Sequence, residues 1–241
     1  MMTSVVPSSE AARRCEHLLS PEERERRARF YFAIDRLEFT LTRGLIRTLL
    51  TWYLGGDPAG WRFTATDHGK PVLANGPGDR PIHFNLSHTR GIVVCALCLE
   101  PEIGIDVEPV AREVERDVAD RFFAPDEVRA LQTVDDIVYP SRFIAYWTAK
   151  EAYIKARGAG LSMPLDGFSI RFAARHPEIH FSDLLPDDET TWQLRQEAIG
   201  GEYMLAIALR RKGTDFPVIT RWFDVDLLGA SDCEATPSRS A

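Results

Sequence analysis

Few features of this sequence point to a membrane, an oxidising compartment or a metal scaffold. Its four cysteines among 241 residues are too few for a disulfide framework, and Cys95 and Cys98 have no second Cys or His pair to complete a zinc site. The longest strongly apolar run, residues 92–99, is far shorter than the roughly 20 residues that a membrane-spanning helix needs. The first residues also lack the charged and apolar regions of a secretory signal. We therefore expect a cytoplasmic protein without a transmembrane segment, whose cysteines lie in the core.

Net positive charge is absent as well. The chain carries a formal charge of -7 at pH 7, which a nucleic-acid backbone or an anionic membrane would repel. Neither is expected as a partner, so any site for an anion has to be local. Apolar residues are plentiful, at 44% of the chain, and they suffice for the core of one large domain or of two small ones packed together.

Four helices are predicted from caps and spacing. Ser20 is followed by Pro21 and, three residues on, by Glu23, which is a helix-start pattern. A second helix carries leucines at every fourth position from 37 to 49 and should end at Gly55. The clearest helix covers residues 141–158, and a short one is expected near 125–129.

Strand patterns alternate with these helices. Residues 92–99 and 103–108 are predicted to be neighbouring strands joined by a turn. Further strands are expected at 168–172, 191–195 and 203–209. Residues 229–241 are polar and are predicted to form a frayed tail.

Two acids on the 103–108 strand are candidate metal ligands. Asp106 and Glu108 are two residues apart, so both carboxylates lie on one face of the strand. Carboxylates held close together repel unless a cation or a proton lies between them, and such hard oxygen ligands suit Mg²⁺ or Mn²⁺. An Asp-x-Glu pattern alone is more often a pair of ordinary solvated acids on an edge strand.

The 141–158 helix brings further charges to one face. Trp147, Glu151 and Lys155 recur at every fourth position beside the apolar Phe143 and Ile154. Charges on a buried stripe need partners, because burial without them is costly. The spacing allows two interpretations: a functional acid and base, or a simple ion pair on a solvated helix.

Four strings of residues, in this order and spacing, resemble the Sfp-type phosphopantetheinyl transferase family, and the match covers most of the chain. They are followed by a glycine-rich segment that the family also has. The four strings are Gly69-Lys70-Pro71, Phe84-Asn85-Leu86-Ser87-His88, Gly104-Ile105-Asp106-Val107-Glu108 and Trp147-Thr148-Ala149-Lys150-Glu151-Ala152-Tyr153-Ile154-Lys155. The segment that follows them is Gly158-Ala159-Gly160-Leu161-Ser162-Met163-Pro164-Leu165.

The resemblance implies an α+β fold with a pseudo-twofold arrangement of two similar halves. Each half is a small antiparallel sheet packed on a long helix, and coenzyme A binds in the cleft between them. We expect the N-terminal half, with the nucleotide contacts, in residues 1–100. The C-terminal half, with the metal and catalytic residues, is expected in residues 101–228, ahead of the flexible tail.

The resemblance also implies the roles of individual residues. Asp106, Glu108 and Glu151 match the metal ligands, which hold Mg²⁺, or alternatively Mn²⁺, against the pyrophosphate of coenzyme A. Glu151 is also the expected general base, and metal ligand and base are competing assignments for it. Lys155 is expected to stabilise phosphoryl charge, with Lys150 contributing nearby.

Further family positions imply contacts to coenzyme A. Lys70, Ser87 and His88 match residues at the nucleotide and its phosphates, where Asp106, Lys150 and Lys155 also belong. Arg26 is expected to reach the ribose 3′-phosphate, and Arg47 is a further candidate. The chain departs from the family where a basic or hydroxyl residue often holds that phosphate, because Glu38 and Phe39 stand there. Arg36 or Thr40 are possible substitutes.

The implied partner is an apo acyl or peptidyl carrier protein, whose serine receives the phosphopantetheine arm as 3′,5′-ADP is released. An apolar patch around Phe122 and Phe123 is the expected docking surface, and a monomer is the expected state. Two alternatives remain. Three acids and a lysine would also serve a metal-dependent phosphohydrolase or nuclease, and a catalytically impaired relative would bind coenzyme A or the carrier without transfer.

Overall fold

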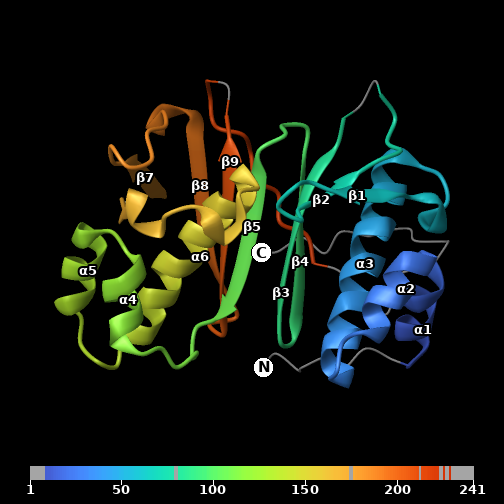
Figure 1. The fold of residues 1–241 in the computed structure, drawn as a ribbon, viewed down its shortest axis with the longest axis horizontal. Coiled ribbons are helices and arrows are strands. Elements are labelled where there is room, and N and C mark those ends of the chain that lie inside the picture. Colours follow the sequence, from blue (N-terminus) through green and yellow to red (C-terminus); the bar gives the residue numbers. More distant parts are fainter. Residues whose placement is uncertain are drawn as a thin grey trace.

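The computed structural model describes residues 9–78, 81–173, 176–211, 213–222, 225 and 228. The tail expected at residues 229–241 lies outside them. Figure 1 shows two halves side by side, each built around one long helix that packs against antiparallel strands. The α+β fold predicted from the family resemblance is confirmed. Within the described residues, no helix is both long and apolar enough to cross a membrane.

The elements follow one another in a mixed order of helices and strands. The helices are α1 (Ser9–Leu18), α2 (Pro21–Ala28), α3 (Ala33–Leu54), α4 (Arg116–Phe122), α5 (Pro125–Gln132) and α6 (Tyr139–Arg157). The strands are β1 (Phe63–Ala65), β2 (Pro71–Leu73), β3 (His83–Thr89), β4 (Ile92–Cys98), β5 (Ile103–Pro109), β6 (Phe168–Phe172), β7 (Pro177–Phe181), β8 (Trp192–Ile199) and β9 (Tyr203–Arg210).

The predicted helices form where local chemistry favours them. At the start of α2, Ser20 accepts a hydrogen bond from the Glu23 amide while the Glu23 carboxylate accepts one from the Ser20 amide, which satisfies two orphan donors. The α3 helix ends at Gly55, whose φ of 76° suits a glycine. Gly158 ends α6 in the left-handed region. Helix α1 has no counterpart among the expected elements.

The strands pair differently from one expectation. β4 and β5 were predicted to be neighbours across the turn at residues 100–102, but β4 pairs with β3 and β5 pairs with β9. In the three-stranded sheet β9 lies between β5 and β8, and β1–β2 and β6–β7 form separate antiparallel pairs. The prediction was wrong because β5 finds its hydrogen-bonding partner far along the chain.

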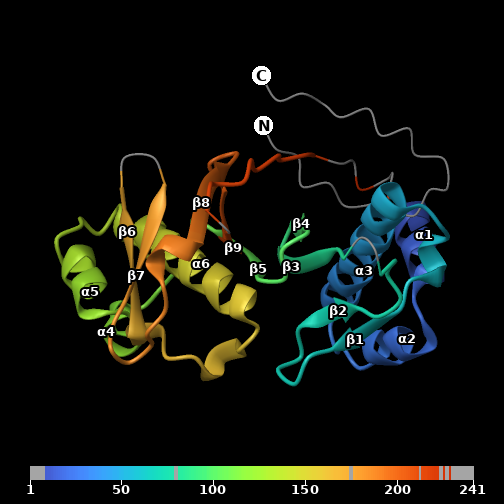
Figure 2. The same cartoon turned by 90° about the horizontal axis from the view of Figure 1, so that it is seen from above.

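The two halves have separate cores and share a third cluster. The core of the C-terminal half surrounds α6, and that of the N-terminal half lies along α3. The shared cluster joins Ala96 of β4 to Ile105 and Val107 of β5. Beyond β9 the chain crosses back toward α3 (Figure 2), and Val225 and Leu228 pack in the N-terminal core. The boundary between the halves is therefore a packed seam.

Candidate active site

The site begins with a close contact between β5 and α6. Gly104 of β5 lies against the helix backbone, and a methyl group there would come inside 3.0 Å of the Ala152 carbonyl oxygen and the Ala156 amide nitrogen. Only a residue without a side chain permits this approach. The contact places Asp106, two residues further along β5, beside Lys155 of α6.

Two polar side chains of β3 reach across the seam to β5. Asn85 is buried, and its Oδ1 accepts a hydrogen bond of 2.9 Å from the Ile105 amide. Ser87, two residues on and on the same face of the strand, donates to Asp106 Oδ1 at 3.0 Å. These bonds join β3 to β5 although no β ladder does so.

Asp106 is the centre of the polar cluster. The residue is 4% exposed, and Lys155 Nζ lies 2.6 Å from its Oδ1 and 2.9 Å from Ser87 Oγ. The other oxygen, Oδ2, is buried and has no hydrogen-bond partner among the residues that the structure describes. An ionised carboxylate with one buried oxygen unsatisfied is costly, so this oxygen is ready to accept a cation or a donor.

Glu108 and Glu151 lie close enough to Asp106 for its charge to affect their pKa values. Burial raises the pKa of Glu151, and the negative charge of Asp106 raises it further. The pKa of Glu108 is also raised, first by burial and then by Asp106, against the opposing effect of Arg112. Arg112 forms an ion pair of 2.9 Å with Glu108. The expected gathering of the three carboxylates on one side of the seam is consistent with these shifts.

The fit of a divalent cation rests on donor chemistry. Within the described ranges, no group of three or more His, Cys, Asp or Glu side chains is arranged to hold a metal ion. The donors are nevertheless the hard oxygens that Mg²⁺ and Mn²⁺ prefer. Asp106 offers a buried oxygen without a partner, and Glu108 and Glu151 are acids whose ionisation a cation would favour. The residues therefore fit a divalent ion.

Lys150 does not belong to this cluster, which contradicts the expectation that it contributes to the phosphate site. Its side chain is fully buried and forms an ion pair of 2.8 Å with Glu127. Nζ also donates to the carbonyls of Leu165 and Phe168. With its donors occupied in the core of the C-terminal half, Lys150 is a structural residue that ties α5, α6 and β6 together.

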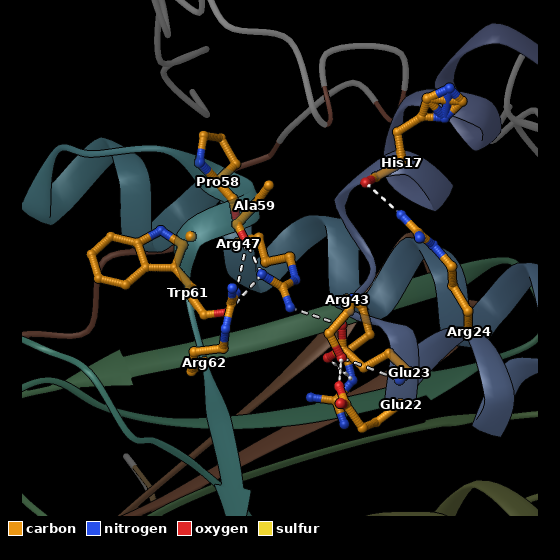
Figure 3. A network of polar contacts seen from close by, with 12 residues as sticks. His17, Glu22, Glu23, Arg24, Arg43, Arg47, Pro58, Ala59, Trp61 and Arg62 are labelled. Atoms are coloured by element: carbon orange, nitrogen blue, oxygen red, sulfur yellow. Dashed lines mark hydrogen bonds and ion pairs between the residues drawn. The ribbon is translucent and has the colours of Figure 1, made fainter.

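Arg47 is likewise buried, which contradicts its expected contact with coenzyme A. Its guanidinium lies inside the N-terminal half, where it contacts Glu23 (Figure 3), and the ion pair between Nη2 and Glu23 Oε2 is 2.8 Å long. It also donates to the carbonyls of Pro58 and Trp61. Only 1% of the side chain is exposed, so Arg47 fixes α2 and the turn after α3 onto the long helix.

His88 and Arg26, two of the basic residues expected to contact coenzyme A, lie beside the positions where the chain departs from the family. The His88 side chain is 46% exposed, and its Nε2 lies 3.9 Å from a carboxylate oxygen of Glu38. The guanidinium of Arg26 lies over the Phe39 ring, 5.7 Å from its centroid, and forms no ion pair within the described part of the chain. The unusual Glu38 and Phe39 therefore contact the two predicted basic residues.

The two suggested substitutes at the 3′-phosphate are engaged elsewhere. Arg36 donates to the carbonyls of Phe30 and Tyr31. Thr40 is buried and accepts from Arg27 Nε at 2.9 Å. Arg26 remains the better candidate.

Lys70 lies at the seam rather than at the carboxylates. Its Nζ donates to the carbonyl oxygens of Ile103 and Ala156, at 3.0 and 3.1 Å. Both acceptors belong to the C-terminal half.

The expected apolar patch is partly present. Phe122 is 47% exposed. Two further apolar residues just before α6 are also exposed, Ile137 at 94% and Val138 at 46%. Phe123 is buried and stacks on Phe143 with ring centroids 4.9 Å apart.

Sequence reasoning missed the roles of Asn85 and Arg112. For Asn85 a signal existed, because a polar residue two positions before Ser87 on a strand must share its face. For Arg112 the sequence offers nothing beyond its spacing of four from Glu108.

The fold and the polar cluster define an enzyme with an acid-rich site at the seam of two halves. A family model described as the 4'-phosphopantetheinyl transferase superfamily matches residues 102–208, and one for the N-terminal part of 4'-phosphopantetheinyl transferase matches residues 5–100. A 4'-phosphopantetheinyl transferase of Bacillus subtilis is 38% identical over 189 residues, which cover 78% of this chain and 81% of the relative. The 4'-phosphopantetheinyl transferase Sfp of Bacillus subtilis strain 168 is 33% identical over 210 residues, covering 87% and 89%. The chain belongs to this family and is of the Sfp type.

Proposed function

We propose that the protein transfers the 4′-phosphopantetheine arm of coenzyme A to a serine of an apo acyl or peptidyl carrier protein and releases 3′,5′-ADP. Family membership gives the reaction class. The observation that carries the proposal is the seam cluster, where the buried Asp106 has one oxygen beside Lys155 and the other without a partner. Such a cluster suits a pyrophosphate with a divalent counter-ion better than an uncharged substrate.

Asp106, Glu108 and Glu151 would hold the divalent ion, Mg²⁺ or alternatively Mn²⁺. When bound, this ion neutralises the pyrophosphate and stabilises the charge on its departing oxygen. Lys155 contributes a fixed positive charge at the same place, since its Nζ is held by Asp106 and Ser87. A preorganised cation of this kind stabilises charge that develops in the transition state.

Glu151 accepts the proton of the carrier serine, directly or through a water. Its raised pKa makes it a stronger base than an ordinary carboxylate. The serine oxygen forms a new bond to the β-phosphorus of coenzyme A. The bond from that phosphorus to the bridging oxygen breaks, and the electron pair leaves with 3′,5′-ADP.

The coenzyme A contacts come mainly from the N-terminal half. Arg26 would bind the ribose 3′-phosphate, since no carboxylate within the described residues pairs with it. His88 and Ser87, at the carboxyl end of β3, would contact the pyrophosphate. The carrier would dock on the apolar side chains of Phe122, Ile137 and Val138, which are exposed in the segment before α6, and the enzyme would act as a monomer.

The proposal is tested by incubating the protein with fluorescent coenzyme A, Mg²⁺ and an apo carrier protein. Label should appear on the carrier serine, and Glu151→Gln should abolish the labelling while the protein remains folded. Glu197→Gln, an exposed glutamate on β8, is the matched control and should retain full activity. An unlabelled carrier, together with hydrolysis of phosphoesters, would refute the transferase assignment in favour of a phosphohydrolase.

A further inference from the structure

Lys70 joins the two halves of the molecule through its ammonium group. It directly precedes β2 in the N-terminal half, yet the two hydrogen bonds of its ammonium group both go to the C-terminal half. Nζ donates to the carbonyl of Ile103, the first residue of β5, and to that of Ala156, in the last turn of α6. One side chain thus holds a strand and a helix of the opposite half.

The acceptors explain why a lysine stands here. The last four carbonyls of a helix have no partner within it, and Ala156 is one of these in α6. A cation at this end also interacts favourably with the helix dipole. The lysine stem passes Gly158, where a methyl group would lie 3.4 Å from Lys70 Cδ. The segments around residues 70 and 158 therefore meet in space.

The ammonium group of Lys70 is partly buried, which weakens its hydration. Burial lowers its pKa to about 8, and the nearby carboxylate of Glu102 opposes this shift. Burial also lowers the pKa of His83, and the charge of Lys70 lowers it further. A partly buried ammonium group that donates to two backbone carbonyls has the contacts of a structural residue.

The two acceptors are adjacent in sequence to the reactive pair. Asp106 lies three residues after Ile103 on β5, and Lys155 directly precedes Ala156 on α6. Movement of either acceptor relative to the N-terminal half would displace Asp106 or Lys155 from Ser87, which is on β3. Through these two carbonyls, Lys70 affects the positions of both Asp106 and Lys155 without contacting either side chain.

We propose that Lys70 is a positioning residue, which fastens the coenzyme A half to the carboxylate half, and that its ammonium binds these two carbonyls rather than a phosphate of coenzyme A. The proposal rests on the function proposed above. It replaces the direct contact that the family resemblance implied for Lys70.

The kinetic test compares Lys70→Met with the wild-type protein. A misplacement of about 1 Å can cost about 100-fold in rate, so we expect kcat to fall by about 10- to 100-fold. The dissociation constant of coenzyme A should change by less than about threefold, because the phosphates lose no contact. Arg62→Met is the matched control, since Arg62 donates to two carbonyls of its own half, those of Ala59 and Trp61, and should keep its kcat.

A second measurement is independent of transfer, so that failure of the proposed function leaves it intact. In hydrogen exchange, the Gly158 amide, which donates to the Ile154 carbonyl at the end of α6, should exchange at least about tenfold faster in Lys70→Met. Amides of the β8–β9 ladder should keep their rates. Lys70→Arg, with donors and charge retained, should restore both exchange and kcat in part.

Two results would overturn the proposal. One is a coenzyme A dissociation constant weakened tenfold or more in Lys70→Met with kcat retained, since that is the loss of a direct phosphate contact. The other is unchanged exchange at Gly158. Should Lys70→Met fail to fold, the same two measurements are made on Lys70→Gln, whose amide retains donors without the charge.

Discussion

Replacing Gly104 with alanine tests how closely β5 must approach α6. The added methyl group would lie inside 3.0 Å of the Ala152 carbonyl oxygen and the Ala156 amide nitrogen, closer than real Cβ atoms come to other atoms. Both obstacles are helix backbone, so no side chain can rotate away. The strand has to retreat from the helix.

The size of the effect follows from this geometry. Restoring an ordinary contact with the Ala152 oxygen requires a retreat of roughly 1.4 Å, and a displacement of about 1 Å can already lower a rate by about 100-fold. Overpacking of a core typically costs about 1–3 kcal/mol of the free energy of unfolding. A gain of about 0.4–1 kcal/mol from the lower entropy of the unfolded chain offsets part of this cost. We expect Gly104→Ala to lower transfer about 100-fold and to destabilise the protein measurably.

Initial rates of carrier labelling and urea unfolding measure the two effects. Gly78→Ala is the matched control, because a methyl group there meets nothing within 4 Å and the backbone is not in the left-handed region. It should keep the wild-type rate, and its free energy of unfolding should be unchanged or higher by up to about 1 kcal/mol. A Gly104→Ala protein with wild-type activity would show that the approach of β5 to α6 does not set the position of Asp106.

Three further substitutions separate the roles of neighbouring groups. Lys150→Met leaves Glu127 buried without its cation and should cost about 3–5 kcal/mol in urea unfolding, and a wild-type unfolding midpoint would contradict the core role. Ser87→Ala removes one donor to buried Asp106 and should cost about 1–3 kcal/mol, with slower labelling; an unchanged midpoint and labelling rate would contradict this. The pKa of Glu151 in the folded protein lies above its ordinary value of 4.5. At pH values between 4.5 and the raised pKa, the folded state therefore binds more protons than the unfolded state, and the free energy of unfolding falls as the pH rises through this range. Glu151→Gln, measured with a chelator present, should show a smaller loss over that range, and an identical pH profile would refute the raised pKa.

Local patterns in the sequence predicted the elements that carry the site. Period-two alternation placed Asp106 and Glu108 on one face of β5, and capping residues placed the start of α2. Pairing was harder, because β5 hydrogen-bonds to β9 and β3 reaches β5 through side chains. Contacts between segments far apart in the chain produce no periodic pattern in the sequence of either segment, so the sequence does not predict which strands pair.

Lys150 and Lys155 show where a usable signal was overlooked. At 3.6 residues per turn, a spacing of five separates two side chains by about 140° around the helix. Lys155 faces the seam and Lys150 faces the core, as this angle requires. Family resemblance had grouped the two lysines at one polyanion, whereas helix geometry alone separates them.

The strings that identified the family contain two kinds of residue. Asp106, Glu151 and Lys155 are the residues to which we assign the chemistry, whereas Asn85 and Gly104 bring the strands and the helix to the seam without any reactive group. A site divided between two halves needs both kinds, because a carboxylate of the right pKa is useless if its partner lies 1 Å away from the reactive position. Gly104 cannot be replaced by a larger residue without moving backbone, and the amide of Ile105 would lose its buried acceptor without Asn85. These two positions therefore impose structural requirements on the sequence in addition to those of the carboxylates.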